Sequence, residues 1–221
     1  ISDRVMRTTY LSNYVPEVVD SSDNFYIYNF LKGDVLSKKV TSKRFEYLLS
    51  WLNDFWKEVN LSKSEQNKFT KDCLKFYKQK TLDRIDLYYK KYDNIDVDEI
   101  VNDNKLEPLK NVLDRLDWDW ISFGKPTRFH GDLHFENILI NETNNGLPFS
   151  LLDWRQNFGG SYEYGDIYYD LAKLYHGLII SHDFINNNLY NFSRDMNDVY
   201  YDFHRKNTNI ECEKILQKYV E

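Results

Sequence analysis

The sequence predicts an α+β protein in which helices predominate over strands. Three observations lead to this prediction: residues 14–40 have strand composition, residues 41–59 show helical periodicity, and residues 135–155 form two apolar runs joined by a turn. Hydrophobic periods of two residues and of about 3.6 residues in one chain indicate that strands and helices share the fold. We therefore expect a β-rich start, a helical middle and a hairpin in the second half.

The β-rich start contains two short apolar runs. Residues 15–19 form the first, residues 20–24 carry turn-forming side chains, and residues 25–30 have the aromatic and β-branched composition of a second strand. The Gly33-Asp34 step then marks the end of this strand. The segment predicts two strands joined by a polar turn.

The segment "TSKRFEYLLSWLNDFWKEV", residues 41–59, predicts an amphipathic helix. Thr41 or Ser42 can cap its N-terminus, because a hydroxyl oxygen accepts a hydrogen bond from an unpaired N–H of the first turn. Its apolar side chains recur at helical spacing on one face: Phe45, Leu48, Leu49, Leu52, Phe55 and Trp56. This face is expected to lie in the core.

Further helices are expected on both sides of a central hairpin. Two or three cover residues 62–117, and the periodicity of residues 100–118 predicts a helix interrupted near Pro108. Residues 164–182 are again helical in pattern, and we expect the tail to Glu221 to be helical as well.

The hairpin itself is predicted for residues 135–155. Phe135–Ile140 is the expected first strand, the turn contains the step Asn145-Gly146, and Phe149–Trp154 is the expected second strand. An Asn-Gly step between apolar runs is a strong hairpin signal because both residues tolerate positive φ angles.

Composition excludes several classes of protein. The 221 residues allow one large domain or two small ones, and a formal net charge of -6 argues against a nucleic-acid binder. Cys73 and Cys212 lie far apart without zinc-ligand spacing, which favours reduced thiols in the cytoplasm. We expect no membrane span and no signal peptide. Because the chain begins with Ile1, we expect native sequence upstream of it.

The string "RFHGDLHFENILI", residues 128–140, holds the polar residues of greatest interest. Asp132 and Asn137 precede the strand-like run Ile138-Leu139-Ile140, and Asp153 lies at the end of the second hairpin strand. A tight hairpin returns the chain near its start, so Asn137 and Asp153 should converge. An amide oxygen and a carboxylate suit Mg²⁺, and Asp132 is placed to accept a proton from an attacking hydroxyl.

A plain polar turn is the alternative to a catalytic loop. Asp and Asn are common turn residues, and His130 can be a packed ring with a single hydrogen bond. The complete order is more restrictive: His130, Gly131 and Asp132, then Asn137, an apolar strand, a turn, and a second strand that ends in Asp153. This order and spacing are those of a kinase catalytic loop followed by its metal-binding aspartate.

Three strings together resemble the aminoglycoside phosphotransferase/choline kinase superfamily of small-molecule kinases. They are "HGDLHFENIL", "LLDW" and "GDIYYDLAKL". The strings "DWRQNFGG" and "YGDIYYDLAKLYHG" are most similar to members associated with bacterial surface polysaccharides, some fused to sugar nucleotidyltransferases. The resemblance implies a protein-kinase-like fold. Residues 1–32 would be a remnant of N-lobe strands and the hinge, and residues 33–221 would form the helical C-lobe with the catalytic loop and the metal-binding hairpin.

The resemblance also implies roles for individual residues. Asp132 resembles the catalytic base, and His130 resembles the histidine that braces the loop. Asn137 and Asp153 resemble the two magnesium ligands. Asp170 resembles the buried aspartate that anchors the catalytic loop from the following helix.

For the nucleotide, ATP or GTP, the resemblance points to the hinge and to the floor of the adenine pocket. Asn29, Phe30 and Leu31 would meet adenine through their backbone groups, while Leu139 and Leu152 would lie beneath it. The family also has a phosphate-covering glycine loop, a strand lysine and a helix glutamate, and residues 1–14 are too few to hold all three.

One departure from protein kinases favours a small-molecule acceptor: His134 occupies the position where Ser/Thr kinases usually carry lysine. The leading hypothesis is transfer of a phosphoryl group to a hydroxyl of a sugar, an amino alcohol or an aminoglycoside-like compound. A non-catalytic kinase-like module that regulates a fused enzyme such as a nucleotidyltransferase is the second hypothesis, and a metal-dependent hydrolase is the third. Fusion to, or association with, an upstream domain is open under the first two hypotheses.

Overall fold

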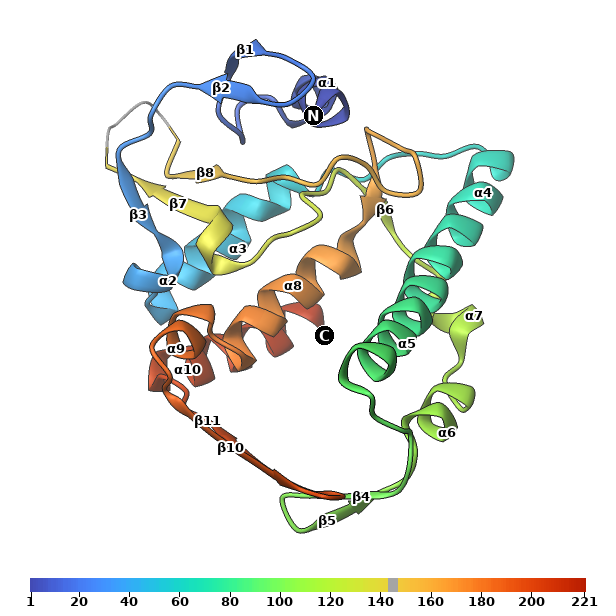
Figure 1. Ribbon diagram of the computed structural model, residues 1–221. Helices are drawn as coiled ribbons and strands as arrows, with labels where there is room; N and C mark the ends of the chain where they lie inside the picture. Colours follow the sequence, from blue (N-terminus) through green and yellow to red (C-terminus); the bar gives the residue numbers. More distant parts are fainter. Residues whose placement is uncertain (143–146) are drawn as a thin grey trace. The chain divides into compact units, whose positions relative to one another are not determined.

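The computed structural model describes residues 1–142 and 147–221 and divides into two compact units (Figure 1). The first unit comprises residues 1–69, 124–181 and 205–221, and the second comprises residues 70–123 and 182–204. Both contain helices and strands, so the predicted α+β class is confirmed. The division into residues 1–32 and 33–221 stays a prediction.

The first unit begins with a helix, α1 (Ser2–Leu11), which the sequence patterns did not predict. Its buried side chains are Arg7 and Leu11, four residues apart. Because one of the two is an arginine, the buried face lacks the apolar periodicity from which an amphipathic helix is predicted. Strands β1 (Val18–Ser21) and β2 (Tyr26–Tyr28) then pair antiparallel, in agreement with the two expected strands and their polar turn.

The hairpin of the second half forms part of a three-stranded antiparallel sheet. Its strands are β3 (Gly33–Val35), β7 (Ile138–Asn141) and β8 (Phe149–Leu151), in the order β3-β7-β8. The expected hairpin is confirmed, but both strands are shorter than predicted. Phe135–Asn137 is a 3-10 turn, and β8 ends at Leu151. The Asn145-Gly146 step lies outside the described residues.

The helical core of the first unit follows the predicted pattern. It consists of α2 (Leu36–Lys39), α3 (Ser42–Phe55), α8 (Ile167–Ile179) and α10 (Asn207–Val220), and α10 packs against both α3 and α8 (Figure 1). The Oγ1 of Thr41 accepts from the Arg44 backbone N–H at 3.2 Å and caps α3 as predicted. All six side chains of the predicted apolar face of α3 are buried.

A short two-stranded sheet explains why the catalytic-loop candidate meets helix α8. Strand β6 (Pro126–Thr127) pairs with β9 (Gly165–Asp166), so the chain before the loop lies beside the chain before α8. The Asp166 side chain accepts from the Tyr168 backbone N–H and caps α8. The first turn of α8 is thereby held at the loop.

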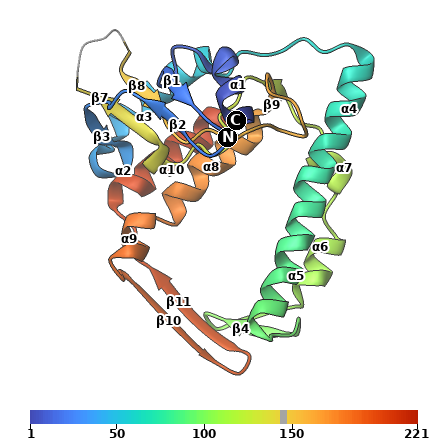
Figure 2. The same ribbon diagram turned by 45° about the horizontal axis from the view of Figure 1, so that its top comes forward.

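The second unit starts within α4 (Lys63–Leu74), whose axis continues through a π-helical turn. Its elements are Lys75–Gln79 (π), α5 (Lys80–Tyr92), α6 (Leu109–Asp114), α7 (Trp118–Ile121), α9 (His182–Asn186), β4 (Glu99–Val101), β5 (Asn104–Leu106), β10 (Tyr190–Asp195) and β11 (Asp198–Phe203). The strands form one sheet in the order β10-β11-β4-β5, and α6 and α7 lie beside α5 (Figure 2).

Two helix predictions in this unit are wrong. Residues 99–106 form a hairpin, and helix begins only after Pro108, because Asn102 and Asp103 both adopt positive φ (47° and 64°), which suits a two-residue hairpin turn. Residues 190–203 form a second hairpin instead of a helical tail. The first hairpin thus reverses at residues that tolerate positive φ, whereas the second reverses at Met196, whose φ of 50° its residue type does not predict.

Within residues 1–142 and 147–221, no helix has both the length and the apolar character needed to cross a membrane.

Candidate active site

Asp170 fixes the backbone of the catalytic-loop candidate. Its carboxylate is fully buried in the first turn of α8 and accepts the backbone N–H groups of His130 and Gly131, both at 2.7 Å. The Trp56 indole also donates to it, at 3.1 Å. Burial raises the pKa of Asp170 to about 6, while the three donors favour its charged form. The structure thus brings Asp170 to the loop, where the resemblance had implied an anchoring residue.

His130 links the loop to the segment that follows β8. Its ring is buried, with Nδ1 accepting from the Asp132 backbone N–H at 3.2 Å. Nε2 therefore carries the proton and donates to the Leu152 carbonyl at 2.9 Å. Burial lowers the pKa of His130 to about 3, so the ring is neutral and its proton is held in a structural hydrogen bond.

Asp132 is half-buried between two cationic side chains. Its Oδ1 lies 2.7 Å from the Lys173 Nζ, and its Oδ2 lies 3.7 Å from the His134 Nε2. Burial alone would raise the pKa of Asp132, but His134 and Lys173 outweigh it and hold the pKa well below its usual range. Asp132 is therefore ionised at neutral pH. Lys173 was not predicted as a site residue, although it lies three residues after Asp170 and therefore on the face of α8 that was expected to meet the loop.

His134 is held as a cation by two carboxylates. Besides Asp132, its Nδ1 lies 3.1 Å from the Glu136 Oε2, and hydrogen bonds to both acids raise the pKa of His134 to about 9 although burial opposes this. Side chains of alternating charge thus lie next to one another, the first from α8 and the others from the loop and the 3-10 turn that follows it: Lys173, Asp132, His134 and Glu136 in order of contact.

Asn137 and Asp153 are joined through the backbone of the hairpin. The Asn137 carbonyl accepts the Leu152 N–H at 2.8 Å, and Asp153 is the next residue. The Asn137 Nδ2 donates to the Asp132 carbonyl at 2.9 Å, which leaves its Oδ1 free to act as an oxygen ligand. One amide and one carboxylate oxygen fit Mg²⁺, which takes few protein ligands alongside water and phosphate. In the described part of the chain, no three His, Cys, Asp or Glu side chains form a metal-binding group.

Asp153 has two further features. It adopts a positive φ of 53°, an unusual conformation for a residue with a side chain. Its exposed carboxylate pairs with the guanidinium of Arg4 in helix α1. The Arg4 carbonyl in turn accepts from the buried Trp154 indole at 2.9 Å. The sequence offered no signal for these contacts, since Arg4 lies about 150 residues from its partners.

The five residues expected to meet the nucleotide lie in different environments. Asn29 is exposed, Phe30 is 90% exposed, and Leu31 is half-buried on a cavity of about 730 Å³ that Lys32 also lines. Leu139 is buried in β7, and Leu152 is half-buried. Their contact with a nucleotide stays a prediction.

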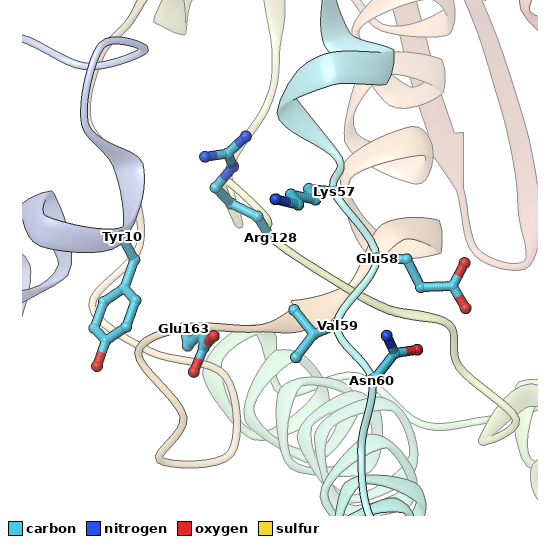
Figure 3. Close-up of a pocket in the computed structure, with 7 residues that line it drawn as sticks. All are labelled: Tyr10, Lys57, Glu58, Val59, Asn60, Arg128 and Glu163. Atoms are coloured by element: carbon cyan, nitrogen blue, oxygen red, sulfur yellow. The ribbon is translucent and has the colours of Figure 1, made fainter.

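A second cavity, of about 310 Å³, lies beside the segment that leads into the loop (Figure 3). Its lining includes Arg128, whose Nε and Nη2 donate to the carbonyls of Phe55 at 2.7 Å and Asp54 at 2.8 Å. These are the last two residues of α3, so Arg128 satisfies the C-terminal carbonyls of this helix and complements its dipole. Glu58 points away from Arg128 in Figure 3 and pairs with Lys125 at 3.3 Å.

Comparison with known proteins identifies the family of this chain. Residues 13–190 match the family model described as the phosphotransferase enzyme family, and this segment contains the loop, the hairpin and Asp170. Neither a curated protein nor a solved structure matches the chain. Because the family match covers more than half of the chain, the resemblance to this superfamily is confirmed, and the chain belongs to the phosphotransferase enzyme family.

Proposed function

We propose that this chain transfers the terminal phosphoryl group of ATP or GTP to a hydroxyl of a small molecule, with Mg²⁺ as cofactor. The observation that carries the proposal is the ionisation state and position of Asp132. It is an ionised carboxylate on a loop whose backbone is fixed by Asp170, and it follows Gly131 in a chain of the phosphotransferase enzyme family.

Asp132 acts mainly by orienting the acceptor. The acceptor oxygen forms a bond to the γ-phosphorus while the bond to the β,γ-bridging oxygen breaks, and the hydroxyl proton passes to the Asp132 carboxylate. Because its pKa is low, Asp132 is a weak base, which suits a loose transition state in which the proton leaves late. Lys173 and His134 place positive charge beside the Asp132 carboxylate and keep it ionised.

Mg²⁺ would be held by the Asn137 Oδ1 and the Asp153 carboxylate. When bound, it supplies positive charge that neutralises the phosphate oxygens during transfer. The pairing of Arg4 with Asp153 means that the metal and Arg4 compete for this carboxylate.

The kinase-like division of the chain belongs to the same proposal. Residues 1–32 would be the N-lobe remnant and hinge, with Asn29, Phe30 and Leu31 at the adenine, and residues 33–221 would be the C-lobe, with Leu139 and Leu152 beneath the base. The hairpin of β1 and β2 directly before residues 29–32 supports this assignment. We further propose a cytoplasmic protein whose acceptor is a sugar, an amino alcohol or an aminoglycoside-like compound, and which is fused to, or associates with, an upstream domain.

The test is nucleotide turnover of the purified protein against a panel of these acceptors. Asp132→Asn and Asp153→Asn should each lower turnover by about 100-fold or more, since each removes a charge that acts directly in the transfer. Asp202→Asn, at an exposed position of β11, is the matched control and should retain activity. All three variants should remain folded, with Asp132→Asn the least stable because it loses the pairing with Lys173 and His134. Near wild-type turnover by Asp132→Asn would exclude the mechanism.

A second function, a kinase-like module that binds nucleotide without transferring phosphate, is favoured by the contact between Arg4 and Asp153. It predicts measurable Mg²⁺–nucleotide binding by calorimetry, no turnover with any acceptor, and no gain of turnover in Arg4→Ala. Turnover by the wild-type protein excludes it.

A further inference from the structure

Arg7 is a buried cation that binds the backbone of the catalytic loop. It lies in the middle of α1, is 0% exposed, and uses four of the five N–H donors that a guanidinium offers. Every acceptor is a backbone carbonyl: Phe129, His130 at 3.3 Å, Arg155, and Tyr162 at 3.0 Å. Three chain segments around the candidate active site therefore meet at this one side chain.

Two of these carbonyls belong to peptide groups that Asp170 also binds. The carbonyl of Phe129 and the N–H of His130 form one peptide group; Arg7 donates to the carbonyl and Asp170 accepts from the N–H. The next peptide group repeats this arrangement, with the His130 carbonyl on Arg7 and the Gly131 N–H on Asp170. Since C=O and N–H point in opposite directions in a trans peptide, the two side chains hold each peptide plane from opposite edges.

The charges explain why this arrangement tolerates burial. Burial lowers the pKa of Arg7 to about 10, and the negative charge of Asp170 opposes this, so Arg7 remains cationic at neutral pH. Its guanidinium also lies 4.0 Å from the centroid of the Phe129 ring. The two buried charges compensate each other through the peptide dipoles between them, and each charge is satisfied by hydrogen bonds.

We propose that Arg7 is a positioning residue for phosphoryl transfer, which sets the direction of Asp132 by fixing the two peptide planes that precede it. This inference rests on the proposed function. Gly131, between the fixed planes and Asp132, has a φ of 90°, so rotation of either plane would swing the Asp132 side chain away from the acceptor. Helix α1, anchored in the core by Leu11, thereby controls the geometry of a loop more than 120 residues away in sequence.

Arg7→Lys is the main test, because it keeps the positive charge and removes the planar guanidinium group with its fixed N–H donors. The matched control is Arg205→Lys in the same compact unit, where Arg205 donates to the Leu178 carbonyl at 3.2 Å and pairs with Glu213, with no contact to the loop. Both variants should lower the unfolding temperature. Only Arg7→Lys should lower kcat, by about 10- to 100-fold, with the KM for nucleotide within about threefold of wild type, as expected for misplacement of a reacting group.

The pH dependence of kcat distinguishes a positioning role of Arg7, which acts through Asp170, from a general loss of stability. Arg7→Met removes the cation that opposes the raised pKa of Asp170, so Asp170 should take up a proton at higher pH than in the wild type. The titratable groups that face Asp170 are Arg7 and the neutral His130. The acid limb of the kcat profile should therefore move to higher pH in Arg7→Met and stay in place in Arg205→Met. Coincident acid limbs would contradict the proposal.

Amide hydrogen exchange tests the inference independently of activity. In the wild-type protein the amides of His130 and Gly131 should be among the slowly exchanging ones, and Arg7→Lys should accelerate exchange at these two positions more than in α10. If the wild-type protein shows no turnover, the proposed function fails while this measurement still decides whether Arg7 fixes the loop. Fast exchange of both amides in the wild type, or equal kcat loss in Arg7→Lys and Arg205→Lys, would overturn the inference.

Discussion

Arg7 and Asp170 bind opposite edges of the same two peptide groups, those that join Phe129 to His130 and His130 to Gly131. They are oppositely charged and buried, yet each forms two of its hydrogen bonds with the backbone between them, and no hydrogen bond joins the two side chains directly. The pair therefore differs from an ordinary buried salt bridge, because its strength depends on the conformation of the loop.

We expect the two residues to be energetically coupled. Asp170→Asn should lower the free energy of unfolding by about 3–5 kcal/mol, because it leaves the Arg7 charge uncompensated and turns an amide NH₂ toward N–H donors. The double variant Arg7→Met with Asp170→Asn should cost at least about 1 kcal/mol less than the sum of the single variants. Urea unfolding of the four proteins measures this coupling, and additive losses would contradict it.

Gly131 should not tolerate a side chain. A Cβ at this position would lie 2.5 Å from the Arg155 Cβ, and its φ of 90° is unfavourable for any residue other than glycine. Gly160→Ala is the matched control, since Gly160 has a φ of 89° but no atom within 4 Å of the added Cβ. Calorimetry should show a larger loss of stability for Gly131→Ala than for Gly160→Ala. Equal losses would mean that the neighbouring side chain moves aside without cost.

Stability should fall as His134 loses its proton. The pKa of His134 is raised to about 9, above the ordinary value of about 6.5, so its stabilising contribution is complete below the ordinary value and disappears as pH rises through about 9. The free energy of unfolding should decline over this range in the wild type and decline less in His134→Gln. Parallel pH profiles would show that the ring is not held as a cation by Asp132 and Glu136.

Lys173 should keep Asp132 ionised at acid pH. Removing the contact at 2.7 Å in Lys173→Met raises the pKa of Asp132, which an NMR titration of the Asp132 carboxyl carbon measures directly. Lys173→Arg should restore most of the wild-type titration because it retains the charge. Lys218→Met, in the last turn of α10, serves as the control for loss of a lysine. An unchanged titration of Asp132 in Lys173→Met would exclude this role.

The parts of the fold that sequence predicted are those with strong local signals. Helix α3 has an N-cap and six apolar residues at helical spacing, and the hairpin of β7 and β8 has two apolar runs on either side of a polar turn. The second unit was less predictable. Residues 99–106 have a weak helical pattern, and their Asn102-Asp103 turn is recognised only when the positive φ angles are seen.

The residues of the candidate site also differ in how strongly the local sequence indicates them. Asp132, Asn137 and Asp153 belong to one local motif with fixed spacing, so the sequence could indicate them. Arg7 could not be indicated, because it reaches the loop through tertiary packing, whereas Lys173 lies three residues after Asp170 on the same face of α8 and was overlooked. A buried arginine also contradicts the rule that charged residues lie outside, and only the cluster of backbone carbonyls explains its position.

The positive φ of Asp153 bears on how this protein would change under mutation. A left-handed conformation costs an ordinary residue about 1–2 kcal/mol, and the exposed pairing with Arg4 returns about 1 kcal/mol at most. Replacement by glycine would therefore leave folding nearly untouched while it removed the carboxylate. Selection for stability alone would not retain an aspartate at position 153. A gene copy whose product no longer needed the biochemical activity would therefore lose this residue early, and its product would still fold.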